Sequence, residues 1–116
     1  MNQMITPLSL GEVEERILRL CEALEEESER YADLAAERAD AEADFKYRHS
    51  RAFIEQNGKM PVATKEAVAQ MRAANDFRRY RLLEARERAT QSKLTSLRAQ
   101  LEALRTIAAN VRFQTR

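Results

Sequence analysis

The stretch NGKMPVAT, residues 57 to 64, divides the 116-residue chain into two long segments, and residues 12–56 and 65–116 contain neither glycine nor proline. Glycine loosens a helix and proline removes one of its amide donors, so this stretch marks a break between two helical segments. Both segments are rich in alanine and leucine and have no alternating β-branched run, which favours helices over strands. The sequence therefore predicts an all-α fold, a single domain over residues 1–116 with a helix at about 9–57, a loop at 58–63 and a helix at about 64–110.

Residues at the expected helix ends carry capping signals. Ser9 can accept a hydrogen bond from the first turn, and Glu12, three residues later, completes a capping box. Asn57 and Gly58 are expected to end the first helix, with the glycine in the left-handed conformation that helix C-termini commonly need. The second helix is expected to start near Thr64 and to continue without a break.

Apolar residues recur along the first helix at steps of three and four, which indicates a heptad seam on one face. Ten positions fit: Leu10, Val13, Ile17, Leu20, Leu24, Tyr31, Leu34, Ala41, Phe45 and Ala52. Three polar residues, Glu27, Arg38 and Arg48, occupy the other positions of this register.

The second helix carries its own seam, with one extra residue after Ala89. Its expected members are Val68, Met71, Leu82, Ala85, Ala89, Leu97, Leu101, Leu104, Ala108 and Val111. If the chain folds back at the loop, facing residues have numbers that sum to about 120, as in the pairs Leu10 with Val111, Val13 with Ala108, Ile17 with Leu104, Leu20 with Leu101, Leu24 with Leu97, Tyr31 with Ala89 and Ala52 with Val68. A short connection makes neighbouring helices antiparallel, so the expected architecture is a long, coiled-coil-like antiparallel helical hairpin.

A second apolar stripe remains outside this pairing: Tyr80, Leu83, Leu94, Ile107 and Phe113, with Leu8 and Leu18 on the first helix. A lone helix pair buries only one narrow stripe per helix. The leftover stripe therefore predicts a homo-oligomer, although singly scattered exposed leucines are also ordinary.

The net charge is +1, but the charged residues are distributed unevenly along the chain. Residues 12–44 contain 13 acids and 4 bases, whereas residues 45–116 contain 16 bases and 6 acids. Some of these cations have expected partners, because the facing rule places Arg79 near Asp40, Arg86 near Asp33 and Lys93 near Glu26. Such pairs would fix the antiparallel register while adding little stability.

Cations without expected partners gather at the loop end of the hairpin. There the stretch DFKYRHSRAF, residues 44–53, faces the similar stretch DFRRYR, residues 76–81. Cations attract phosphates, and exposed aromatic rings stack on unpaired bases, so this loop-end cluster predicts single-strand binding without sequence preference. Its members are Lys46, Tyr47, Arg48, His49, Arg51, Phe53, Lys59, Lys65, Arg72, Arg78, Tyr80 and Arg81.

Signals for other classes of function are missing from the sequence. No phosphate loop, nucleophile elbow or cluster of catalytic side chains is present, so we expect no enzymatic activity. The single cysteine, Cys21, and the single histidine, His49, have no partner at metal-ligand spacing, so no metal and no cofactor are expected. No apolar run is long enough to span a bilayer and no secretory signal is evident, which predicts a cytoplasmic protein without membrane or small-molecule partners.

The segments AEADFKYRHSRAF, NGKMPVATKEA and LTSLRAQLEALRTIAANVR, in this order of helix, turn and basic helix, resemble small helical proteins of tailed bacteriophages, among them UvsY-type recombination mediators. The resemblance implies an oligomeric protein of the host cytoplasm that binds single-stranded DNA and helps to load a recombinase onto strands covered by a single-strand-binding protein. The acidic first helix departs from that pattern, because the proteins it resembles are basic along much of their length. A non-enzymatic coiled-coil protein, such as a phage assembly chaperone or adaptor whose cations serve the hairpin and its oligomer, is the alternative.

Overall fold

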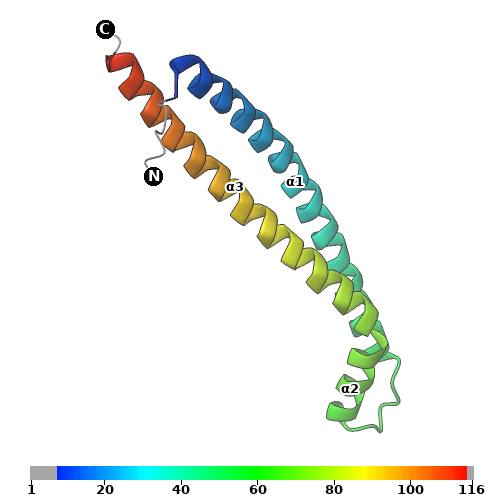
Figure 1. Cartoon of the computed structure of the whole chain (residues 1–116). Helices are drawn as coiled ribbons and strands as arrows, with labels where there is room; N and C mark the ends of the chain where they lie inside the picture. The colour runs from blue at the N-terminus through cyan, green and yellow to red at the C-terminus, as the bar shows by residue number, and fades with distance from the viewer. Residues whose placement is uncertain (1–7, 115–116) are drawn as a thin grey trace, which may run out of the picture. The chain divides into compact units, whose positions relative to one another are not determined.

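The computed structural model describes residues 8–114, and over this range the chain is all-helical, as predicted. The helices are α1 (Leu10–Ile54), α2 (Val62–Arg72) and α3 (Ala74–Gln114), and none of the described residues forms a strand (Figure 1). The chain divides into two compact units. Unit 1 combines the chain up to Glu29 with the chain from Gln91, and unit 2 comprises Arg30–Thr90. In each unit a part of α1 lies antiparallel to a part of α3, consistent with the expected helical hairpin (Figure 1).

Side chains satisfy the free backbone groups at both ends of α1. The amide of Glu12 donates to Ser9 Oγ at 3.2 Å, and the Ser9 hydroxyl donates to the Glu12 carboxylate at 3.2 Å, which confirms the predicted cap. At the other end, Gln56 Nε2 donates to the carbonyl of Ala52 at 2.9 Å. Gly58 does not have the positive φ that we predicted. The side chain of Gln56 binds a free carbonyl at the end of α1, so a left-handed residue is not needed for that bond.

The loop and the start of α2 are held by short-range bonds. Asn57 Oδ1 accepts from the amide of Lys59 and its carbonyl accepts from the amide of Met60, both at 3.0 Å. Pro61, with φ −58° and ψ 145°, precedes the first turn of α2, and its carbonyl accepts from the amide of Lys65 at 3.1 Å. The helix therefore begins at Val62, two residues before the predicted Thr64, directly after Pro61 as its N-cap residue.

The second helical segment is not continuous, contrary to the prediction. Ala73, with φ −94° and ψ 6°, separates α2 from α3. Its amide still donates to the carbonyl of Ala69 at 3.0 Å, and its carbonyl accepts from the amide of Phe77 at 2.9 Å. The break is a local change of backbone angle at a buried alanine, which no glycine or proline announces in the sequence.

The seam predicted for α1 is confirmed. Twelve of its thirteen positions are buried or half-buried, and Arg48 alone among them is exposed. The most completely buried are Val13, Ala41 and Ala52. Glu27, predicted as a polar interruption, is also buried, at 5% exposure.

The seam predicted for the second helical segment is wrong from Met71 to Ala89, although Val68 at its start is half-buried. Met71 and Leu82 are 74% and 52% exposed, whereas Leu83 and Leu94, assigned to the outer stripe, are both 5% exposed. The buried and half-buried positions follow an unbroken heptad through Ala69, Ala73, Asp76, Tyr80, Leu83, Glu87, Thr90, Leu94, Leu97, Leu101, Leu104 and Ala108. Because Leu83 and Leu94 are buried within their own units, they cannot form the oligomer contact that we predicted for them.

Ion pairs join the polar seam positions of α1 to α3. Glu27 accepts from Lys93 Nζ at 3.2 Å in unit 1. In unit 2, Arg38 Nε donates to Glu87 at 2.7 Å, and the guanidinium of Arg48 pairs with the carboxylate of Asp76. The polar residues that interrupt the apolar pattern therefore meet each other across the helix pair.

The register of these pairs differs from the predicted one. Arg79 lies 3.4 Å from Asp44, one helical turn beyond the predicted Asp40, and Lys93 pairs with Glu27 in place of its neighbour Glu26. No ion pair joins Arg86 to Asp33 among residues 8–114. The difference arises because the prediction placed Met71 and Leu82 in the seam, whereas the structure leaves both exposed.

Candidate nucleic-acid interface

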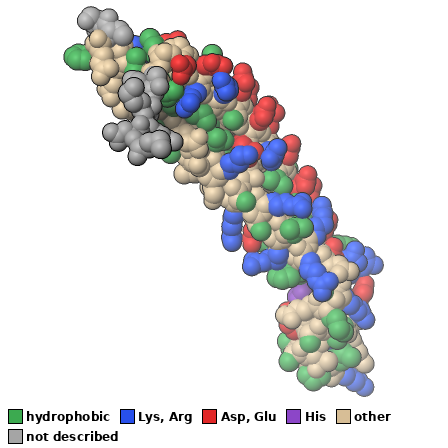
Figure 2. All heavy atoms as spheres, viewed as in Figure 1, with side chains coloured by type: hydrophobic (Ala, Val, Ile, Leu, Met, Phe, Trp, Pro, Cys, Tyr) green, Lys and Arg blue, Asp and Glu red, His purple; other side chains and the backbone are tan. Residues whose placement is uncertain are grey.

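All twelve residues of the loop-end cluster lie in unit 2. The end of α1 supplies Lys46, Tyr47, Arg48, His49, Arg51 and Phe53, the loop supplies Lys59, and the other helices supply Lys65, Arg72, Arg78, Tyr80 and Arg81. Figure 2 shows the Lys and Arg side chains spread over the surface of this part of the chain, around α2 and the adjoining ends of α1 and α3. The structure thus brings the cluster together from three helices.

The two Asp-Phe copies meet, as predicted. The rings of Phe45 and Phe77 lie 5.1 Å apart between centroids, and Tyr80 stacks 6.2 Å from Phe45. His49 completes the group, with its ring 5.9 Å from that of Phe45. Because these rings pack against each other between α1 and α3, they stabilise the platform that carries the cations.

Three cluster cations pair with a carboxylate three or four residues away. Lys46 lies 2.9 Å from Glu42, Arg51 lies 2.8 Å from Glu55, and Arg81 lies 2.9 Å from Glu84. These cation side chains are 58% to 69% exposed. Exposed pairs of this kind contribute little stability, so the cations remain able to exchange partners.

Three more cluster residues connect different segments of unit 2. Arg48 pairs with Asp76 between α1 and α3, and His49 Nε2 lies 3.0 Å from Glu66 Oε1 between α1 and α2. Arg72 lies 4.0 Å from Glu55, just after α1. These contacts hold the helix ends in place and are the part of the cluster with a structural role.

The remaining cations of the cluster have no carboxylate within 4.0 Å among the described residues: Lys59, Lys65 and Arg78. Lys65 Nζ lies 5.8 Å from the centre of the Phe53 ring, a cation–π contact. Residues 45–81 contain nine Lys and Arg but only three acids, Glu55, Glu66 and Asp76. Internal pairing therefore leaves a positive surplus at this end of unit 2.

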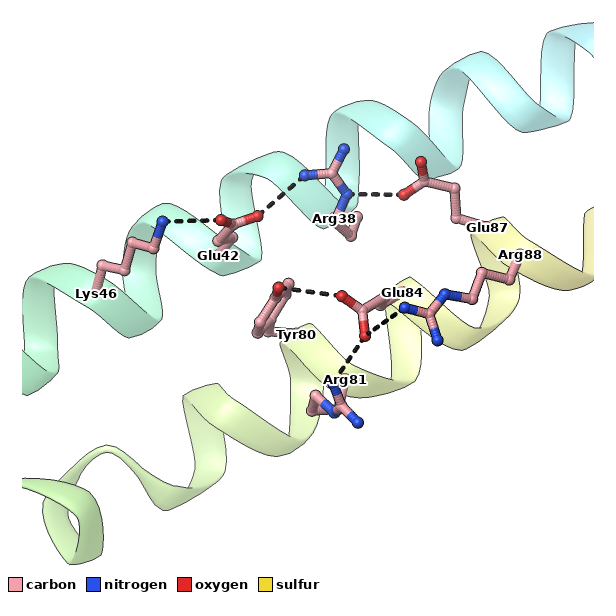
Figure 3. A network of polar contacts seen from close by, with 8 residues as sticks. All are labelled: Arg38, Glu42, Lys46, Tyr80, Arg81, Glu84, Glu87 and Arg88. Atoms are coloured by element: carbon pink, nitrogen blue, oxygen red, sulfur yellow. Dashed lines mark hydrogen bonds and ion pairs between the residues drawn. The ribbon is translucent and has the colours of Figure 1, made fainter. Parts of the chain in front are cut away.

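A polar network borders the cluster, and it was not predicted (Figure 3). Glu42 accepts from both Lys46 and Arg38, and these bonds lower the pKa of its carboxyl group. The bond to Glu42 raises the pKa of Lys46, and the bond to Glu87 raises the pKa of Arg38. The spacing of Glu42 from Lys46 was the available sequence signal, since residues four apart are neighbours on a helix.

Glu84 forms a second branch of the network on α3 (Figure 3). It accepts from the hydroxyl of Tyr80 at 3.1 Å and pairs with Arg81 at 2.9 Å and with Arg88 at 3.7 Å. The bond to Glu84 raises the pKa of the Tyr80 hydroxyl. Tyr80 is half-buried and its hydroxyl is bound, so its ring serves the packing of unit 2 more than an open stacking surface.

Among the aromatic side chains of the loop-end cluster Tyr47 is the most exposed, at 65%, and its hydroxyl accepts a 3.1 Å bond from Arg51 Nη1. Phe77 is 44% exposed, with the guanidinium of Arg81 5.9 Å from its ring centre, and was not among the predicted stacking residues. Phe53 is half-buried beneath Lys65. Two rings of the region are therefore open to a planar ligand, one on α1 and one on α3.

A groove of about 590 Å³ lies beside Tyr47. Its charged lining is balanced, with three arginines and three carboxylates: Arg48, Arg51, Arg72, Asp44, Glu55 and Asp76. A phosphate entering the groove would have to displace a carboxylate from its arginine. The surplus cations outside the groove, Lys59 and Lys65 among them, meet no such competition.

Within residues 8–114 no group of three His, Cys, Asp or Glu side chains could hold a metal ion. Over the same range no helix combines the length and the apolar character needed to cross a bilayer. Comparison with protein-family models, curated proteins and solved structures found no match for the chain.

Proposed function

We propose that the protein is a single-stranded DNA-binding accessory protein of the recombination-mediator kind, acting as a homo-oligomer through the loop-end cluster of each copy. One observation carries this proposal: residues 45–81 hold nine Lys and Arg against three acids, and the surplus is exposed at one end of unit 2. A recombinase or a single-strand-binding protein is the further partner that its resemblance to UvsY-type mediators implies. A host-cell cytoplasmic location belongs to the same proposal.

In this proposal the cations without carboxylate partners make the first contacts with phosphate. Lys59 and Arg78 are exposed, and Lys65 lies between them in the chain at the start of α2. Binding of phosphate releases condensed counterions, which is the main source of affinity for a strand held without sequence preference. Tyr47 and Phe77 then offer faces on which bases stack, each contributing about 1–3 kcal/mol.

The test is titration of a fluorescent oligo-dT with purified protein at several salt concentrations. Replacing Lys59, Lys65 and Arg78 by alanine should weaken binding and flatten the slope of log K against log salt by about 2 units, since each phosphate contact on a single strand contributes about 0.7. The matched control replaces three exposed cations of α3 that lie outside the cluster, Arg86, Arg98 and Arg105. Equal effects of the two sets would mean that attraction is diffuse and that the cluster is not the binding site.

A coiled-coil adaptor or assembly chaperone is the second candidate, and a specific observation favours it. Six cluster residues, Lys46, Arg48, His49, Arg51, Arg72 and Arg81, already pair with carboxylates inside the protein. In that case the cations serve the helical pair itself. Absence of oligo-dT binding at low salt would decide for this candidate, because counterion release is greatest there.

A further inference from the structure

Unit 1 contains a second groove, of about 550 Å³, that the proposed DNA-binding function does not use. Leu20 and Ala23 of α1 and Ala103 and Leu104 of α3 form its apolar surface. Arg16 and Arg19 lie on its α1 side and Gln100 on its α3 side. The two alanines are small, so the backbone of another helix can approach the groove closely.

Arg16, Arg19, Ala23 and Glu26 are spaced by three, four and three residues and therefore share one face of α1. Arg16 and Glu26 are both exposed, and no ion pair involving either is present among the described residues. Arg19 pairs with Glu15 at 2.6 Å. The groove is thus flanked along α1 by a cation on one side and a carboxylate on the other, each five residues from position 21.

This spacing is self-complementary under a two-fold rotation. Suppose that a second α1 lies antiparallel to the first, with the two-fold axis at the height of residue 21. Then Arg16 faces the partner's Glu26, and Glu26 faces the partner's Arg16. Arg19 faces the partner's Ala23, which places the apolar groove at the centre of the contact. A parallel arrangement would instead bring Arg16 beside its own copy, and like charges across an interface are costly.

We infer that this face of unit 1 is the contact between two copies of the chain, paired antiparallel about residue 21 of α1. The occupant is a second copy because one face of α1 carries both members of each ion pair, Arg16 and Glu26, at positions symmetric about residue 21. The two ion pairs are equivalent by symmetry, as an isologous interface requires. The contact replaces the predicted one through Leu83 and Leu94, which are buried within their own units.

Charge exchange tests this pairing. Arg16→Glu places two carboxylates opposite each other at both ends of the contact, and Glu26→Arg places two cations there. Each single variant should weaken dimerisation about tenfold or more, and the double variant Arg16→Glu/Glu26→Arg should restore it. Sedimentation velocity measures the change, since the dimer has twice the 13.4 kDa mass of one chain.

The matched control is Arg98→Glu, an equal charge change at an exposed α3 residue outside the groove lining, which should leave the mass unchanged. Circular dichroism melts of all variants establish that they fold. A wild type that sediments as a monomer at about 100 µM overturns the inference. Dimerisation that the double variant does not restore overturns it as well. Neither outcome bears on oligo-dT binding by the loop-end cluster, although a monomeric wild type would contradict the homo-oligomeric state that the proposed function includes.

Cross-linking gives an independent geometric test in a Cys21→Ser background. Protein carrying Arg19→Cys, mixed with protein carrying Ala23→Cys, should form a disulfide-linked dimer under mild oxidation, because these positions face each other across the axis. Each protein alone should cross-link far more slowly, since its cysteines lie on opposite sides of the axis. Equal cross-linking of the mixed and single samples would contradict the antiparallel arrangement.

Discussion

The two units are built from the same pair of helices, but different kinds of residue hold the helices together in each unit. In unit 1 the buried seam is mainly large and apolar, with Val13, Leu94 and Leu101, and a single buried carboxylate, Glu27. In unit 2 the buried apolar residues are mostly alanines, and ion pairs such as Arg38–Glu87 and Arg48–Asp76 join the helices. Alanine buries little surface, so unit 2 relies more on aromatic packing and on charge pairs for its register.

This difference suits the proposed roles of the two units. The end of unit 2 presents exposed cations above the packed rings of Phe45, Phe77 and Tyr80, a platform that does not need a deep apolar core. Unit 1 carries an apolar groove with acidic and basic residues spaced for contact with a second helix. One unit would bind nucleic acid and the other would assemble copies of the chain.

The largest change in the free energy of unfolding is expected from removing a leucine from the sparse apolar seam of unit 2. Leu83→Ala should cost about 2–4 kcal/mol, because the side chain is buried at 5% exposure and leaves a cavity. Leu82→Ala is the matched control and should change stability by less than about 0.5 kcal/mol, since that leucine is 52% exposed. Urea unfolding followed by circular dichroism measures both, and a larger cost for Leu82→Ala would mean that the seam runs through the other leucine.

The adjacent leucines also explain what the sequence could and could not predict. The α1 seam was predictable because apolar residues occupy ten of its thirteen positions. On α3 the seam passes through the polar residues Asp76, Glu87 and Thr90. The apolar pattern instead favoured Met71 and Leu82 and required one extra residue after Ala89. Asp76 and Glu87 are half-buried as partners of Arg48 and Arg38 on α1, and such pairing is recognisable only once the register of the two helices is known.

The site was predictable to a similar extent. The meeting of the two Asp-Phe copies follows from folding back at residues 57–64, which the sequence marks clearly. Which cations are paired does not follow, because Lys46 and Arg81 bind carboxylates on their own helices that the facing rule ignores. The kink at Ala73 has no sequence signal, since alanine is the best helix former.

A smaller change in the free energy of unfolding, this time an increase, is expected from removing the buried charge of unit 1. Glu27→Leu should stabilise the protein by about 1 kcal/mol, because a well-packed apolar side chain avoids the cost of burying a carboxylate. Its partner Lys93 is 59% exposed, so water can solvate the ammonium group once the carboxylate is gone. Glu25→Leu, at an exposed position of the same helix, is the control and should be close to neutral. Thermal unfolding measures the difference, and destabilisation by Glu27→Leu would show that the Glu27–Lys93 pair contributes more than apolar packing can replace.

The smallest expected effect is a pH dependence of stability that originates in the charge network of unit 2. Lys46 and Arg38 donate hydrogen bonds to Glu42 and lower the pKa of its carboxyl group below the unfolded value of about 4.3. A lowered pKa means that the unfolded chain takes up this proton first, so the contribution of Glu42 to stability is complete near neutral pH. It is lost as the pH falls from about 5 through the pKa of the folded state. The difference in melting temperature between the wild type and Glu42→Gln should therefore be constant between pH 6 and 8 and shrink toward pH 3.

Lys46→Ala provides the control for this pH dependence, because the bond from Lys46 is the largest cause of the shift. In that background the effect of Glu42→Gln should be smaller and should vary less with pH. The hydrogen bond from Arg38 to Glu42 would remain, so the variation should decrease and not vanish. An unchanged pH dependence in the Lys46→Ala background would assign the shift to Arg38 alone, through its ion pair with Glu42 at 3.0 Å.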